Sequence, residues 1–168
     1  AIINVSKAVF EKSTLLVLEG IKINVKETSV ELTGYDLEIG IQTEIGARST
    51  GTGQFVVNAR LMAEMIKKMN SEDVTLEVVD NQQIKVYGGD TEYTVMYMNA
   101  VEFPTLPSKT DDAEIFSISQ PILKSMISQT VFAVAQTDAK PVLKGELFEI
   151  ENNILKVVAI DGYRLAIR

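Results

Sequence analysis

The chain has 168 residues, of which 46% are hydrophobic and 23% are charged, as is typical of globular proteins. It contains no histidine and no cysteine, which excludes imidazole and thiolate chemistry and the common zinc sites. The net charge of −7 argues against a protein that holds nucleic acid by bulk attraction, although it does not exclude local basic patches.

The first part of the chain is predicted to be a helix followed by a meander of strands. Residues 1–10 carry Ile2, Val5 and Val9 at helical spacing, but no N-cap precedes them. From Leu15 onward the pattern has a period of two, which predicts strands. Its apolar residues are Val17, Ile21, Ile23 and Val25, then Val30 and Leu32, then Leu37, Ile39, Ile41 and Ile45.

Residues 46–53 (GARSTGTG) are small and polar and precede a short predicted strand at 55–57. They lack the lysine and hydroxyl pair of a nucleotide-binding loop and lead into a strand rather than a helix. We therefore interpret them as a hairpin connection.

A helix is predicted from Asn58, a good N-cap, to Met69. Its apolar face contains Leu61, Met62, Met65, Ile66 and Met69. Its other face carries Arg60, Glu64, Lys67 and Lys68. One face of the helix is therefore apolar, and the opposite face is mostly basic.

Further strands are predicted at 74–79, 83–87 and 91–98. Asp80-Asn81 and Gly88-Gly89 supply the two turns between them. Residues 103–112 (FPTLPSKTDD) then mark a domain boundary, because two prolines and a polar run interrupt both periodicities.

The second part is predicted as strand, helix, strand, strand. The expected elements are a strand at 115–118, a helix with Ser119 as its cap and Pro121 in its first turn, and a hairpin of residues 142–151 and 154–160 across Asn152-Asn153. The apolar face of this helix contains Ile122, Leu123, Met126, Ile127 and Val134.

Residues 17–36 and 142–161 run in parallel without a gap, at an offset of 125 given by Asp36 and Asp161. The other identical pairs are Val17/Val142, Leu18/Leu143 and Gly20/Gly145. Beyond the aspartates we expect the register to slip by one, so that Ile39 and Ile41 fall opposite Leu165 and Ile167. An offset of this size is a domain length. We expect one copy of a fold and part of a second, in an excerpt of a longer protein.

Five motifs occur in order along the chain: LEG at 18–20, LTGYDLE at 32–38, VNAR at 57–60, EFPTL at 102–106 and VAIDGYRLA at 158–166. Together they resemble the bacterial DNA polymerase III β subunit, the replicative sliding clamp. The resemblance implies an α+β DNA-clamp fold of repeated domains, with helices lining the inner face and antiparallel sheets on the outside. It divides the chain into a first domain without its opening strand (1–106), a linker (107–113) and the first half of a second domain (114–168).

The function that this resemblance implies is a non-catalytic, cofactor-free processivity factor. Two subunits close head to tail into a ring around double-stranded DNA, and short hydrophobic peptides attach the DNA polymerase III catalytic subunit, the clamp loader, and other polymerases and repair proteins. Basic inner helices within an acidic ring would reconcile the net charge with DNA binding. Charges interrupt every hydrophobic stretch, so we expect no membrane segment and a cytoplasmic protein.

The resemblance also assigns site residues. The DNA contacts would be Lys12, Arg60, Lys67 and Lys68, with Lys124 and Lys140 in the second unit. One wall of the partner-peptide groove would be Ile160, Gly162, Tyr163, Arg164 and Leu165. Tyr93 and Val95 would lie at the subunit interface. From the residues alone, the simpler interpretations are a solvated helix face for the basic residues, an Asp-Gly turn for the groove residues and a half-buried edge strand for Tyr93 and Val95.

Two other classes of function fit the composition. A β-rich adhesion or ligand-binding repeat domain would also be acidic, repeated and without catalytic residue types. A serine–lysine hydrolase is supported only by scattered residues, and Asp36 and Asp161 are better explained as equivalent positions of two copies than as a catalytic pair. The basic helix face between Arg60 and Lys68 favours the clamp.

Overall fold

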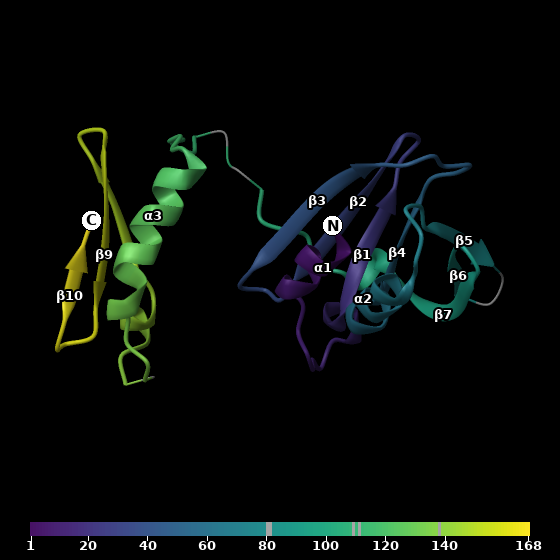
Figure 1. The fold of residues 1–168 in the computed structure, drawn as a ribbon, viewed down its shortest axis with the longest axis horizontal. Coiled ribbons are helices and arrows are strands. Elements are labelled where there is room, and N and C mark those ends of the chain that lie inside the picture. Colours follow the sequence, from purple (N-terminus) through teal and green to yellow (C-terminus); the bar gives the residue numbers. More distant parts are fainter. Residues whose placement is uncertain (80–81, 109, 111, 138) are drawn as a thin grey trace. The chain divides into compact units, whose positions relative to one another are not determined.

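The computed structural model describes every residue except 80, 81, 109, 111 and 138. It divides into two compact units, Ala1–Ser108 and Lys109–Arg168 (Figure 1). The turn predicted at Asp80-Asn81 lies outside the described residues. None of the helices in the described ranges has the length and apolar character that crossing a bilayer requires.

The first unit is a seven-stranded antiparallel sheet with helices packed on one face. Its helical elements are α1 (Ile2–Val5), α2 (Ala59–Lys68) and the 3₁₀ turns η1 (Ser6–Ala8), η2 (Leu16–Glu19) and η3 (Ala100–Glu102). Its strands are β1 (Gly20–Val25), β2 (Ser29–Tyr35), β3 (Gly40–Gly46), β4 (Gly53–Asn58), β5 (Thr75–Val79), β6 (Gln83–Gly88) and β7 (Thr91–Asn99).

The strand order in this sheet is β3-β2-β1-β4-β7-β6-β5. Ile23 of β1 lies opposite Leu32 of β2 on one side and Phe55 of β4 on the other. Strands β3 and β4 are therefore not neighbours, and the chain between them has to pass β2 and β1. The predicted hairpin at 46–53 is wrong, because small polar residues indicate a connection without specifying which strands it joins.

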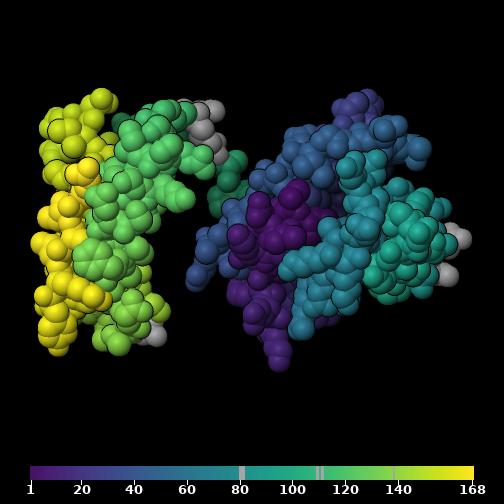
Figure 2. Space-filling model, viewed as in Figure 1, coloured from purple at the N-terminus to yellow at the C-terminus, as the bar shows by residue number. Residues whose placement is uncertain are grey.

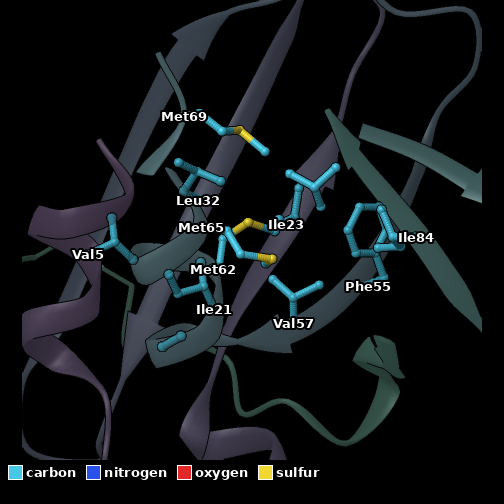
Figure 3. Close-up of a cluster of buried hydrophobic side chains, with 12 residues drawn as sticks. Val5, Ile21, Ile23, Leu32, Phe55, Val57, Met62, Met65, Met69 and Ile84 are labelled. Atoms are coloured by element: carbon cyan, nitrogen blue, oxygen red, sulfur yellow. The ribbon is translucent and has the colours of Figure 1, made fainter. Parts of the chain in front are cut away.

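Alternate strand residues face the helices and form one buried core (Figure 3). Ile21, Ile23 and Val57 are at most 1% exposed, and Met62 of α2 is fully buried against them. Burying each such side chain stabilises the fold by about 1.5–3 kcal/mol. This core fixes α2 on the sheet and turns its opposite face outward.

Helix α2 begins as predicted, but its apolar face differs by one residue. The side chain of Asn58 accepts a hydrogen bond from the Leu61 N–H at 3.0 Å, which confirms the N-cap. Leu61 itself is 52% exposed rather than buried. The buried stripe runs through Ala59, Met62 and Met65, and Leu61 lies about 100° around the helix from Met62.

Two predictions near the start of the chain are wrong in their boundaries. The first helix ends early, since α1 and η1 stop at Ala8 and Val9 is extended, with φ −128° and ψ 137°. Val17 lies in η2 rather than in a strand. Both Val17 and Leu18 are buried, beside Val56 on the other face of the sheet, and two consecutive buried residues do not fit a half-buried strand.

The second unit is a three-stranded antiparallel sheet with one helix packed on its central strand. Its elements are α3 (Gln120–Thr130), the 3₁₀ turns η4 (Val131–Ala133) and η5 (Pro141–Lys144), and strands β8 (Leu147–Glu151), β9 (Ile154–Ile160) and β10 (Leu165–Ile167). The predicted hairpin across Asn152 and Asn153 is confirmed, and both residues have positive φ, as a tight hairpin turn requires.

Several predictions for this unit are wrong. Residues 115–118 form no strand, because the described residues offer them no pairing partner, and Ile115 is 70% exposed. The strand expected from 142 begins only at Leu147, after η5. Ser119 occupies the N-cap position but makes no side-chain capping bond. Ile122 is exposed, and Val134 lies beyond the end of the helix.

The offset of 125 residues extends across both units. Strand β9 reproduces β2 with both ends displaced by 125, and the same displacement relates η4 to η1 and η5 to η2. The turns after β2 and β9 also agree. Asp36 accepts the N–H groups of Glu38 and Ile39, and Asp161 accepts those of Tyr163 and Arg164.

The expected one-residue slip after the aspartates is therefore wrong. The left-handed residue of the turn is Leu37, with φ 71°, in the first unit and Gly162, with φ 92°, in the second. Gly40 then pairs with Tyr35 as Leu165 pairs with Ile160. Because the aspartate closes a turn of the same length in both units, Ile39 is equivalent to Arg164.

Candidate functional site

The segment from Asp161 to Leu165 forms the turn between β9 and β10. One carboxylate oxygen of Asp161 accepts the backbone N–H groups of Tyr163 and Arg164, each at 3.0 Å. The other accepts the Arg164 Nε–H at 2.9 Å. The Tyr163 N–H, with the two Arg164 donors, holds the pKa of Asp161 below its ordinary value, against the opposing effect of desolvation.

The side chains that this turn presents differ in their surroundings. Tyr163 is 100% exposed and makes no contact that would fix it among the described residues. Arg164 is held by Asp161 and also lies over the ring of Phe132, with Cζ 5.8 Å from the ring centroid. Sequence reasoning missed Phe132, which follows α3 and carries no motif of its own.

Val157 and Ala159 are buried on one face of the sheet in the second unit. The other face carries an exposed apolar surface next to the turn. Ile160 lies opposite Leu165, at 40% and 57% exposure, so the structure brings these two predicted groove residues together. Sequence reasoning missed the other members of this surface, Leu147, Val158 and Ile167, which are paired across β8, β9 and β10. Val158 and Ile167 lie two residues from Ile160 and Leu165, and that spacing along β9 and β10 was the available signal.

Gly162 has a backbone reason to be glycine. Its φ of 92° is one that L residues rarely adopt, while no atom within 4 Å would meet an added Cβ. We expect Gly162→Ala to weaken the β9–β10 pairing by about 1–2 kcal/mol through backbone strain alone. Amide hydrogen exchange in the 168-residue chain measures this, with faster exchange expected in both strands.

Gly145→Ala is the matched control for Gly162→Ala. It also has open space around the added Cβ, but its φ is −115°. We expect it to leave exchange in β9 and β10 unchanged. Equal effects of the two variants would contradict the strain argument.

Two predicted DNA contacts of the first unit lie together. Lys12 and Arg60 line one open hollow of about 550 Å³ where the chain after η1 passes the start of α2. The N-terminal segment and α2 lie side by side at the surface (Figure 2). Arg60 is highly exposed, and its Nε donates to Glu64 one turn along at 3.1 Å.

The hollow also contains Glu11 and Glu19, whereas Lys67 and Lys68 stand at the other end of α2. Both are exposed in the last turn, about 10 Å along the helix from Arg60. Among the described residues neither lysine has an ion-pair partner, whereas Lys26, Lys85 and Lys156 each pair with a glutamate. In the second unit Lys124 of α3 and Lys140, the residue before η5, are exposed.

Tyr93 and Val95 on β7 are half-buried, and their side chains pack against the core of the first unit. Their backbone has one paired and one open side. Residues Thr91–Met96 pair with β6, while β4 reaches only Tyr97 to Asn99 on the other side. Within the described residues no strand covers that side of residues 91–96. It is an open strand edge of the kind that pairs with another chain.

The described residues contain no cluster of three histidine, cysteine or acidic side chains that could hold a metal ion. Asp36 and Asp161 each serve as the acceptor of their own turn. The exposed features of the described residues are the basic residues of α2 and one apolar sheet face, which are surfaces suited to binding other molecules.

The family model of the DNA polymerase III beta subunit N-terminal domain matches residues 1–107, and the model of its central domain matches residues 117–168. The chain belongs to the DNA polymerase III beta subunit family. Among curated relatives, the beta sliding clamp of Halalkalibacterium halodurans is 38% identical over 173 residues, covering 98% of this chain and 45% of that protein.

Solved structures of beta subunits confirm the α+β clamp fold. The sliding clamp of Bacillus subtilis has a TM-score of 0.89 at 31% identity, covering 99% of this chain and 46% of that one. A Pseudomonas aeruginosa clamp bound to griselimycin has a TM-score of 0.88 at 32% identity, covering 99% and 45%. The chain thus spans about half the length of the beta subunits it matches. The family assignment does not favour the adhesion or ligand-binding alternative.

Proposed function

We propose that this sequence acts within a non-catalytic sliding clamp, a cytoplasmic processivity factor that encircles duplex DNA. The observation that carries the proposal is the exposed basic face of α2 in a chain of the beta subunit family. Arg60, Lys67 and Lys68 project from one helix that the core holds by its opposite face. They contact phosphates transiently, and Lys12 adds a fourth positive charge at the Arg60 end.

The partner-peptide surface is the apolar face at the end of the second unit. Its apolar base is the pair of Ile160 and Leu165, and its polar contacts come from Tyr163 and Arg164, which directly precede Leu165 in the turn after Gly162. Its partners are short hydrophobic peptides of the polymerase III catalytic subunit, the clamp loader, and other polymerases and repair proteins. Because a Pseudomonas aeruginosa relative binds griselimycin, we propose griselimycin as the test ligand for this surface.

Ring closure uses the open edge of β7. A strand of a second subunit pairs with residues 91–96, and the partly exposed sides of Tyr93 and Val95 pack against it. Main-chain hydrogen bonds would supply affinity, and the two apolar side chains would set the register.

The DNA proposal is tested by removing the three charges of α2 in a full-length subunit that carries this sequence. For Arg60→Gln/Lys67→Gln/Lys68→Gln, we expect duplex binding to weaken and the slope of log affinity against log salt to fall by about 2–3, roughly 0.9 for each lost phosphate contact. Binding to a labelled duplex, measured by fluorescence anisotropy across a salt series, gives this slope.

The control is Lys26→Gln/Lys85→Gln/Lys156→Gln, which removes the same charge from ion-paired lysines that lie after β1, on β6 and on β9. We expect the control to keep the original slope, because those lysines lie outside α2 and add no charge to its exposed face. If both triple variants lose the same affinity, only net charge matters and the assignment of α2 is wrong. Loss of the subunit from circular DNA after linearisation tests encirclement separately.

A further inference from the structure

The second unit carries an arginine and an aromatic ring that its fold does not require. Phe132 is 57% exposed, so burial in a core does not account for a phenylalanine there. The Arg164 side chain is 49% exposed, yet it is held at two places, by Asp161 and by the Phe132 ring. Arranging a long side chain in this way costs rotamer entropy.

The first unit provides an internal comparison. At the constant offset of 125, η1 corresponds to η4 and Asp36 to Asp161, so Lys7 stands in place of Phe132 and Ile39 in place of Arg164. In both units the aspartate closes the turn after the strand by accepting two backbone N–H groups, and the first unit does so without an arginine or a phenylalanine at these positions. The pair of Phe132 and Arg164 is therefore an addition to the second unit, where the apolar surface lies, rather than part of the turn.

The bonds of Arg164 leave most of its donors available. A guanidinium has five N–H donors, and the Nε–H is given to Asp161. Within the described ranges the two terminal amino groups have no protein acceptor. In the chain, Arg164 stands between Tyr163, which is fully exposed, and Leu165, which pairs with Ile160 in the apolar surface.

We propose that Phe132 is a positioning residue, whose ring holds the Arg164 guanidinium ready for the acceptor oxygens of a molecule bound on the adjoining apolar surface. This inference rests on the proposed peptide surface and adds a residue from a different element to it. Cation–π contacts at exposed sites have energies that correspond to about a 2- to 5-fold change in affinity. Preorganising Arg164 strengthens binding by avoiding its ordering cost when the ligand arrives.

The first test needs no ligand. In the 168-residue chain, NMR of the Arg164 Nε–H should show a ring-current shift and slowed exchange. We expect Phe132→Leu to abolish the shift and Phe132→Tyr to keep it. The control Phe116→Leu changes an equally exposed phenylalanine, at 52%, and should leave Arg164 unchanged. An Arg164 signal that is indifferent to Phe132→Leu would overturn the positioning role.

The second test is a double-mutant cycle on griselimycin binding in a full-length subunit with this sequence. We expect Phe132→Leu to weaken binding about 2- to 5-fold, Arg164→Ala to weaken it further, and the combination to be no weaker than Arg164→Ala alone. Phe132→Tyr should bind normally. If the double variant weakened binding by the product of the two single-variant factors, the two residues would act independently and the proposal would be wrong. If the unmodified subunit fails to bind griselimycin, the peptide surface itself is wrong, while the NMR test still decides the role of Phe132.

Discussion

Replacing Gly34 with alanine is expected to destabilise the first unit by about 3 kcal/mol. Gly34 lies on β2 beneath α1, and an added Cβ would overlap the Val5 carbonyl oxygen. It would also come within 3.0 Å of Val9 Cγ2. The obstacle is backbone, so the new methyl group forces α1 away from the sheet. Overpacking of this kind costs about 1–3 kcal/mol and sometimes more.

The measurement for Gly34→Ala is urea unfolding of the chain followed by tyrosine fluorescence. Four of the five tyrosines, Tyr35, Tyr87, Tyr93 and Tyr97, lie in the first unit. Gly46→Ala is the matched control, since nothing lies within 4 Å of its added Cβ, and we expect it to stay within about 0.5 kcal/mol. A Gly34→Ala chain as stable as the control would mean that α1 does not pack closely on β2.

Met62→Ala should cost about 2–5 kcal/mol of unfolding free energy in the first unit. Met62 is fully buried between α2 and the strands, and truncating it removes burial and leaves a cavity. The surrounding residues Ile21, Ile23 and Val57 belong to strands paired on both sides, which limits how far they can collapse into the space.

The control for Met62→Ala is the adjacent residue. Leu61 is 52% exposed, so Leu61→Ala removes little buried surface and alanine favours the helix; we expect a change within about 0.5 kcal/mol. Both variants are compared by the same urea unfolding. If Leu61→Ala were the more costly of the two, the helix would face the core as its sequence pattern indicated and not as the structure places it.

Local patterns predicted most of the elements and part of the site. The Asn58 cap, the strands of the first unit and the hairpin at Asn152-Asn153 follow from propensities and periodicities within a few residues. The motifs around Gly162 and Arg164 and the residue pairs at offset 125 also lie in the sequence itself. Phe132 was missed because its contact with Arg164 joins residues that are distant in the chain and share no motif.

The family, the positions of most strands, the start of α2 and the existence of a repeat could all be predicted from the amino-acid sequence, because each depends on residues that are neighbours along the chain. Three features became visible only in the folded chain: β3 and β4 are separated by two strands, Leu61 faces outward, and the repeat continues without a slip past Asp161. Strand order and helix rotation depend on which apolar faces can be buried together, and a turn's length depends on the hydrogen bonds that close it. Gly34 in the first unit corresponds to Ala159 in the second, and the two residues differ by one methyl group. A methyl group at position 34 would destabilise the first unit because the carbonyl oxygen of Val5 occupies the space above Gly34.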